Sequence, residues 1–213
     1  MAVGYNPRIV TDGLVLALDA ANTKSYPSSG GSTWYDLSGN GNNGNINGAT
    51  HTSGVGGYFS FDGSNDYVSF SSYSQPAYSS SSTFTWSVWV YPVSNSNNPI
   101  IGNRGTDLNF TKLTSNNFEY YSDNFGGAMT LNEWQNICIT KNGTSFTYYK
   151  NGSSIATQTS SITKPSKPFF IGGDNTASEY SNHRISMAMV YTAALTASEV
   201  KQNYNAIKGR FGI

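Results

Sequence analysis

The stretch Phe84-Thr-Trp-Ser-Val-Trp-Val-Tyr-Pro92 is the longest run of strand-forming residues in the chain. Side chains alternate between the two faces of a β-strand, and both faces of this stretch are largely apolar. One face carries Phe84, Trp86, Val88 and Val90, and the other carries Thr85, Ser87, Trp89 and Tyr91. Such a strand is usually central in its sheet, with a partner layer on one face and either more protein or a shallow ligand surface on the other. Pro92 ends the run because proline cannot donate a hydrogen bond to a central ladder.

The composition favours one all-β domain that binds neither nucleic acid nor membranes. Aromatic residues make up 14% of the 213 residues and charged residues only 11%, with 12 basic side chains balancing 12 acidic ones. Residues 1–25 lack the pattern of a signal peptide, and no apolar run approaches the roughly 20 residues of a membrane span. We therefore expect a single soluble domain over residues 1–213, in which the lone Cys138 fills core rather than reacts.

Turn signals divide the chain into many short strands. Gly13 to Asp19 predicts a first strand, and the Asn142-Gly143 and Asn151-Gly152 pairs predict two hairpin turns that make residues 134–158 a three-strand meander. Residues 20–56 carry no periodic pattern. Further strands are expected at 57–61, 66–70, 99–103, 107–113, 117–122, 169–172 and 184–191.

One helix is marked near the end of the chain. Thr196-Ala-Ser-Glu199 has the sequence of a capping box, Leu195 and Val200 are spaced as its hydrophobic staple, and Gly209 is placed to close it. Val200, Tyr204 and Ile207 share one helical face. We expect that face to dock on the sandwich, because a helix this short is marginal alone.

This order of strands predicts a two-sheet antiparallel jelly-roll sandwich with one short C-terminal helix. The motifs that carry a family resemblance are Gly13–Asp19, Asp36–Gly44, Phe61–Val68, Phe84–Pro92, the stretch from Trp134 through Asn142-Gly143, and Val190–Glu199. In this order they resemble the laminin-G-like, concanavalin A-like lectin/glucanase domains over residues 13–207. The resemblance implies one domain, with an arm at residues 1–12 and a helix and tail from about 196 to 213. The two ends, Tyr5–Leu14 and Asn203–Gly212, are similar to those of laminin-G-like proteins in tailed-phage virions.

The acidic residues do not form the catalytic pattern that the resemblance implies for glycosidases of this fold. Those enzymes carry carboxylates at alternate positions of one strand, and retaining chemistry needs a separation of about 5 Å. None of Glu119, Glu133, Glu179 and Glu199 has a second acid two residues on. Glu119 and Asp123 share a face, but four residues of strand separate them by roughly 13 Å. We therefore predict that the chain is not an enzyme.

Aspartates in the loops are candidate metal ligands. Asp62-Gly-Ser-Asn-Asp66 alternates oxygen ligands as a calcium loop does, although Tyr67 stands where an EF-hand has glycine. Members of the resembled family hold calcium at the rim of the sandwich, which makes Asp36, Asp62, Asp66 and Asp174 the candidate Ca²⁺ ligands. The alternative is that each aspartate bonds its own turn backbone. No cofactor is required by the sequence.

Aromatic residues suggest a carbohydrate surface. Trp89, Tyr91, Tyr120, Tyr121 and Tyr149 are candidates to line the concave sheet, where flat rings cover sugar faces and Asn or Ser side chains bond hydroxyls. The alternative is that these rings pack under loops or against a neighbouring subunit.

Together these observations predict a non-enzymatic phage virion surface protein, a decoration, fibre or adhesion module that is made in the host cytoplasm and binds glycans. Its expected partners are other virion proteins and further copies of itself, as a homo-oligomer. Phe211 and Ile213 in the C-terminal tail are the candidate docking contacts, the alternative being a frayed end. A free-standing carbohydrate-binding lectin is the rival interpretation, and a glycoside hydrolase is the third.

Overall fold

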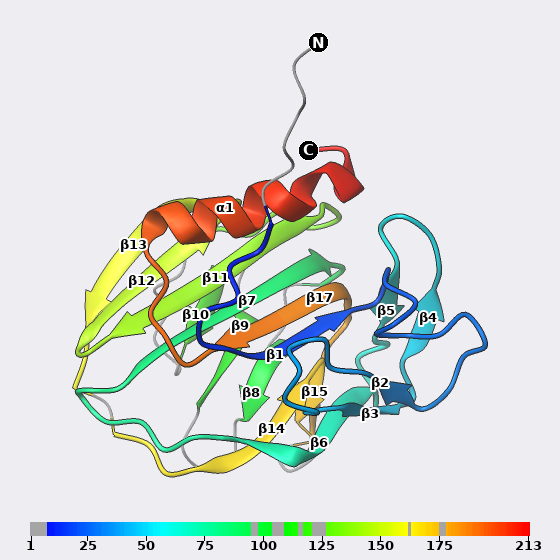
Figure 1. Ribbon diagram of the computed structural model, residues 1–213, viewed down its shortest axis with the longest axis horizontal. Helices are drawn as coiled ribbons and strands as arrows, with labels where there is room; N and C mark the ends of the chain where they lie inside the picture. The colour runs from blue at the N-terminus through cyan, green and yellow to red at the C-terminus, as the bar shows by residue number, and fades with distance from the viewer. Residues whose placement is uncertain are drawn as a thin grey trace.

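Two antiparallel β-sheets and one helix form the three layers of the computed structural model (Figure 1). The structure describes residues 8–94, 98–103, 109–114, 117–120, 127–161, 163–174 and 178–213; the side chains of 98 and 109–114 are not part of this description. In these ranges no helix is long and apolar enough to cross a membrane.

The helix α1 (Ala197–Ile207) covers the first sheet, called the helix-side sheet below. Among the described residues the order of its strands is β13 (Ser153–Thr159), β12 (Ser145–Lys150), β11 (Gln135–Asn142), β7 (Thr83–Pro92), β17 (His183–Tyr191), β5 (Tyr58–Ser60) and β4 (Thr50–Thr52), with β1 (Leu14–Asp19) also paired to β17. The second sheet runs β10 (Asn117–Tyr120), β9 (Asn109–Thr114), β8 (Asn98–Asn103), β14 (Lys167–Ile171), β6 (Tyr67–Gln75), β3 (Gly44–Asn47) and β2 (Thr33–Trp34). A small ribbon joins β15 (Gly173–Asp174) to β16 (Glu179–Tyr180).

The strand β7 is central in the helix-side sheet, as its two apolar faces predict. It pairs with β11 on one side and β17 on the other. Phe84, Trp86, Val88 and Val90 enter the core between the two sheets, with Phe59, Phe118 and Phe169. Burying each of these side chains stabilises the fold by about 1.5–3 kcal/mol. The opposite face, at Trp89, is covered by more protein rather than open.

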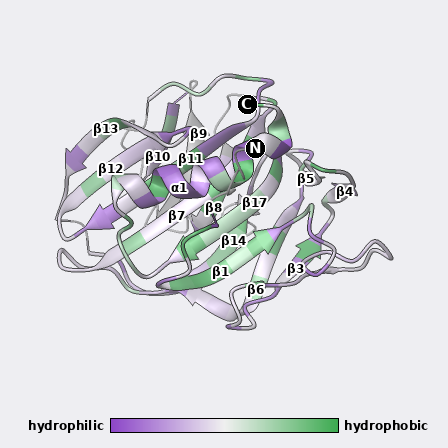
Figure 2. Cartoon of the chain, turned by 45° about the horizontal axis from the view of Figure 1, so that its top comes forward, coloured by the Kyte–Doolittle hydropathy of each residue, from purple (hydrophilic) through white to green (hydrophobic). Residues whose placement is uncertain are grey.

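That cover is the C-terminal helix, and the predicted docking face is confirmed. Val200, Tyr204 and Ile207 are buried in one cluster with Trp89, Cys138, Tyr149, Met187, Met189, Tyr191 and Leu195. Figure 2, in which this layer comes forward, shows α1 lying over β7 and β11. The capping box is present, with the Thr196 side chain accepting from the Glu199 N–H and the Glu199 carboxylate accepting from the Thr196 N–H.

The helix ends differently from the prediction. It stops at Ile207 and continues as a 3₁₀ turn, η2 (Lys208–Phe211), and the left-handed residue that follows is Gly212 at φ 73°. Gly209 therefore does not close the helix, because the tighter turn carries the chain past it.

Local turn chemistry places the meander where it was expected. Asn142 pairs with Ser145 across the first turn, and Gly143, Asn151 and Gly152 all have positive φ angles. The two strands predicted around Asp62-Gly-Ser-Asn65 exist, but β5 belongs to the helix-side sheet and β6 to the second sheet. The unpatterned residues 20–56 contain three short strands, β2, β3 and β4.

Candidate functional site

Three of the predicted glycan-binding aromatics are buried. Trp89 is 0% exposed, Tyr120 3% and Tyr149 5%, so the expectation that they line an open concave surface is wrong. The cluster under α1 includes Trp89 and Tyr149, and Tyr120 points into the core between the sheets. Tyr121 lies outside the described residues. Tyr91 remains half-buried at the end of β7.

Tyr91 is part of a half-exposed group that we call the aromatic–arginine surface, comprising Tyr58, Tyr91, Trp134, Arg184 and Phe211. The Trp134 ring centroid lies 5.7 Å from that of Tyr58 and 5.6 Å from that of Tyr91. Phe211 packs on Trp134 at 4.6 Å, and it also stacks on the buried Trp89 at 4.5 Å. The exposed rings are thus anchored to the cluster beneath α1.

The position of Arg184 follows from strand order, because β17 lies between β7 and β5. Arg184 is directly opposite Tyr91 in the register, and its guanidinium carbon lies 4.7 Å from the Tyr91 ring centroid and 5.3 Å from that of Tyr58. Cation–π contacts of this kind favour a guanidinium held against the two rings. Within the described part of the chain, Arg184 makes no ion pair and no side-chain hydrogen bond.

The surface also keeps its other polar atoms free. Among the described residues, neither the hydroxyls of Tyr58 and Tyr91 nor the indole N–H of Trp134 makes a hydrogen bond. Flat rings beside unengaged donors can cover the apolar face of a sugar and bond its hydroxyls.

Phe211, a docking contact predicted in the tail, packs within its own chain. Its ring packs on Trp89 and Trp134 of the same chain, and the neighbouring Arg210 donates to both carboxylate oxygens of the buried Asp19, at 2.8 and 2.7 Å. Ile213 is 48% exposed. The tail is therefore part of the fold up to Phe211.

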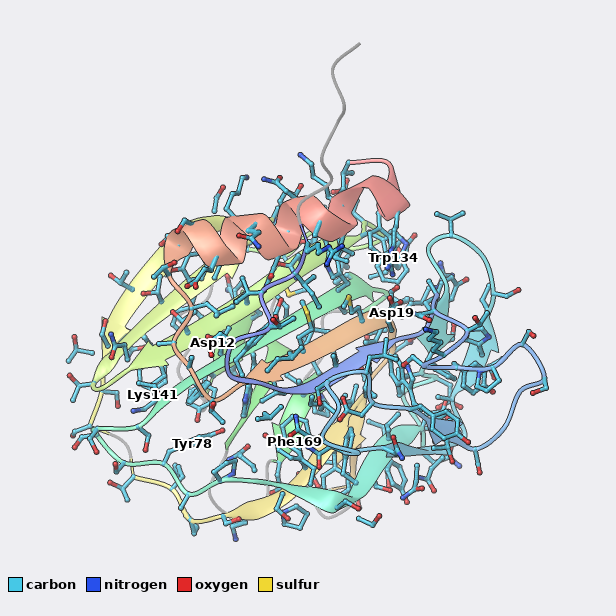
Figure 3. The ribbon with its side chains drawn as sticks, viewed as in Figure 1. Asp12, Asp19, Tyr78, Trp134, Lys141 and Phe169 are labelled. Atoms are coloured by element: carbon cyan, nitrogen blue, oxygen red, sulfur yellow. The ribbon has the colours of Figure 1, made fainter. Side chains whose placement is uncertain are left out.

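A pocket of about 400 Å³ lies elsewhere on the sandwich. Its lining is apolar with an uncharged polar rim: Val15, Asn40, Asn42, Tyr73, Pro76, Ala77, Tyr78, Ser82, Thr83, Phe84, Val190, Tyr191 and Thr192. The buried Lys141 supports one wall, because its Nζ donates to the carbonyls of Ser79, Ser82 and Gly143. Figure 3 shows Tyr78 and Lys141 at lower left and Trp134 at upper right, so the pocket and the aromatic–arginine surface are distinct.

Asp36, the first candidate calcium ligand, accepts hydrogen bonds from nearby backbone. Asp36 accepts from the N–H groups of Ala17, Ser38 and Asn42 and from the Ser38 hydroxyl, at 2.7–3.0 Å. These bonds fasten the loop after β2 to β1.

The other aspartates lie around the turn between β5 and β6. Asp62 accepts from the Ser64 N–H at 2.8 Å, and Asp66 accepts from the Asp62 N–H at 3.0 Å. Burial raises the pKa of Asp66. Asp174 is buried in β15. Asp36, Asp62 and Asp66 accept backbone hydrogen bonds, as the turn-bonding alternative describes. Within the described ranges no three His, Cys, Asp or Glu side chains gather as a metal site.

Neither histidine belongs to the aromatic–arginine surface. His51 contacts the Ala20 carbonyl through Nε2 at 2.9 Å, and His183 is 0% exposed with no hydrogen-bond partner at either ring nitrogen. Glu119 is buried in β10, and Asp123 lies outside the described residues.

Comparison with known proteins now identifies the family. Residues 62–201, more than half of the chain, match the Laminin_G_3 family model, described as the concanavalin A-like lectin/glucanases superfamily. The chain belongs to this superfamily. The two-sheet sandwich with its C-terminal helix is the fold expected for a member, so the predicted fold class is confirmed. No curated protein matches the chain.

Solved structures share this fold at low sequence identity. The binding domain of Paraclostridial Mosquitocidal Protein 1 is 22% identical in sequence and superposes with a TM-score of 0.66. The matched region covers 92% of this chain and 52% of that one. Trypanosoma rangeli sialidase in complex with sialic acid is 15% identical with a TM-score of 0.69, and the match covers 97% of this chain and 36% of the sialidase chain. The Botulinum Neurotoxin serotype G binding domain is 19% identical with a TM-score of 0.66, and the match covers 90% of this chain and 50% of that one. The chain thus spans about half or less of these proteins, and the likeness concerns the fold.

Sequence reasoning missed Tyr58, Trp134 and Arg184 as members of the site. Alternation around Phe59 could have placed Tyr58 on the face opposite the core. Nothing local could have joined it to Arg184, because the contact depends on the order β7, β17, β5 in the sheet.

Proposed function

We propose that this chain is a non-enzymatic recognition module, a lectin-like sandwich that binds glycans and serves as a decoration, fibre or adhesion protein on the surface of a phage particle. The observation that carries the glycan-binding proposal is the aromatic–arginine surface. Its Trp134 ring packs on Phe211, which in turn stacks on the buried Trp89, while its hydroxyls, indole N–H and guanidinium make no hydrogen bond in the described chain. Pre-organised donors beside apolar rings lower the ordering cost of binding.

The relatives support a binding role for such a sandwich. Two of the similar structures are named as the binding domains of toxins, and the sialidase carries a similar sandwich within a chain about three times as long. The absence of paired carboxylates from the sequence supports a role without catalysis.

Glycan binding is tested by probing an array of bacterial and animal glycans with the purified chain. We expect Trp134→Ala to weaken binding about five- to thirtyfold, since loss of a stacked ring removes about 1–2 kcal/mol of binding free energy. Tyr35→Ala is the matched control, because Tyr35 is an aromatic residue 44% exposed outside the surface. Tyr73→Phe removes a hydroxyl from the pocket and should leave binding unchanged.

Two results would contradict this assignment. Loss of binding in Tyr73→Phe but not in Trp134→Ala would move the site to the pocket. A folded wild-type chain that binds no glycan on the array would end the lectin proposal.

The virion role rests on the similarity of the two chain ends to phage laminin-G-like proteins, and it needs a separate test. Quantitative mass spectrometry of purified particles should find the protein at a fixed copy number, and light scattering should show a homo-oligomer. A monomer that is absent from particles yet binds glycans would instead establish the rival, a free-standing lectin.

A further inference from the structure

We infer that the aromatic–arginine surface selects glycans that carry an anionic group, a carboxylate or a sulfate, and that Arg184 is the residue that binds this group. The inference rests on the proposed function, since it names the class of glycan that the same surface takes.

The first support is that the Arg184 charge has no ion-pair partner among the residues that the structure describes. Arg210, which lies beside Phe211 of the same surface, is paired to the buried Asp19 at 2.7 Å, so its charge is already satisfied. Arg184 makes no such contact with any described residue. A half-exposed guanidinium without a carboxylate is the group at this surface that is free to bind an anion.

The second support is that Arg184 is held in place without being neutralised. Its guanidinium lies against Tyr91 and Tyr58, at 4.7 and 5.3 Å from the ring centroids, and its backbone is fixed in β17 between two paired strands. Packing on aromatic rings restricts the side chain yet leaves its N–H donors unused. The ordering cost of a long flexible cation is thereby reduced before the ligand arrives.

The third support is the chemistry of the guanidinium. Its planar fork donates two parallel hydrogen bonds to a carboxylate or sulfate, whereas neutral sugar hydroxyls are served equally well by an amide or hydroxyl. Tyr58, Tyr91 and Trp134 then supply the ring and hydroxyl contacts to the rest of the sugar. Both parts of an acidic glycan, the anion and the apolar ring face, find complementary groups within one surface.

The experiment uses the full chain and matched oligosaccharide probes. Oligogalacturonates carry carboxylates and their methyl esters have the same backbone without the charge, and sulfated galactan oligosaccharides are paired with their desulfated forms. We expect the wild type to bind at least one charged member of a pair more than tenfold tighter than its neutral counterpart, and the preferred pair identifies carboxylate or sulfate.

Variants assign the selectivity to Arg184. We expect Arg184→Gln to lower affinity for the charged probe at least tenfold, with less than twofold change on neutral probes. Arg184→Lys keeps the charge but loses the fork, and should retain an intermediate affinity. Lys24→Gln removes an exposed charge elsewhere and should change nothing. Thermal melting verifies that each variant is folded.

The outcomes separate the two proposals. Equal binding of charged and neutral probes, or an Arg184→Gln variant that keeps its preference for the charged probe, overturns the inference while the glycan-binding proposal stands. Failure to bind any glycan overturns both.

Discussion

His183 gives the fold a predictable sensitivity to acid. The residue opens β17, its carbonyl accepts the Phe61 N–H, and its ring is wholly buried with neither nitrogen hydrogen-bonded. Burial disfavours the charged imidazolium and lowers the pKa of His183 from 6.5 to about 4. The folded chain therefore keeps this histidine neutral across a pH range in which the unfolded chain protonates it.

The magnitude follows from that difference. Below pH 6.5 the unfolded state takes up a proton that the folded state refuses until about pH 4, so the free energy of unfolding falls as the pH falls. Above pH 6.5 the histidine is neutral in both states, so the fold loses no stability through it. At about 1.4 kcal/mol per pH unit, the accumulated loss is about 3 kcal/mol by pH 4.

The assay is urea denaturation of the wild type and of His183→Leu at pH 7.5 and pH 4.5. Leucine has no titratable group, so on going from pH 7.5 to pH 4.5 the free energy of unfolding of the variant should fall by about 2–3 kcal/mol less than that of the wild type. His51→Gln removes the other histidine and should leave the pH dependence of the free energy of unfolding unchanged if His183 is its source. Parallel pH dependence of the wild type and His183→Leu would refute the reasoning.

Two substitutions and one deletion test how the loops and the C-terminal layer are held. Asp36→Ala should lower the free energy of unfolding by about 2 kcal/mol, because four donors lose the carboxylate that accepts their hydrogen bonds. Asp36→Asn keeps one acceptor oxygen and should cost less. Thr196→Ala should cost about 1 kcal/mol through loss of the cap that bonds the Glu199 N–H, with Thr196→Ser as the conservative control. Deleting residues 209–213 should cost about 3 kcal/mol or more, since buried Asp19 loses its arginine. An unchanged urea midpoint in any of these would contradict the contact concerned.

Local chemistry explains what could be predicted from the sequence. The alternation of Phe84–Pro92, the Asn-Gly turns at 142 and 151, and the capping box at Thr196 each depend on residues within a few positions of one another. The helix face of Val200, Tyr204 and Ile207 could also be read locally. These signals were sufficient for the sandwich class and the helix that docks on it.

The site could not be read in the same way, because alternation gives the face of a strand and not what covers it. Trp89 and Tyr91 share one face of β7, yet Trp89 lies beneath α1 and η2 while Tyr91 stays half-exposed two residues further on. The contact of Arg184 with Tyr91 needs the pairing of β17 with β7, which joins positions more than ninety residues apart. Only the completed sheet brings them together.

The C-terminal segment therefore does more than bury an apolar face. By ending at Ile207 and turning through Lys208–Phe211, it covers Trp89 and places Phe211 between that ring and Trp134. The same turn brings Arg210 to Asp19, so that the charge of Arg210 is paired, whereas Arg184 makes no ion pair with any described residue. A tail that ended before Phe211 would leave Trp134 without the ring that packs on it. The Trp134 part of the proposed glycan surface thus depends on where this last layer of the fold ends.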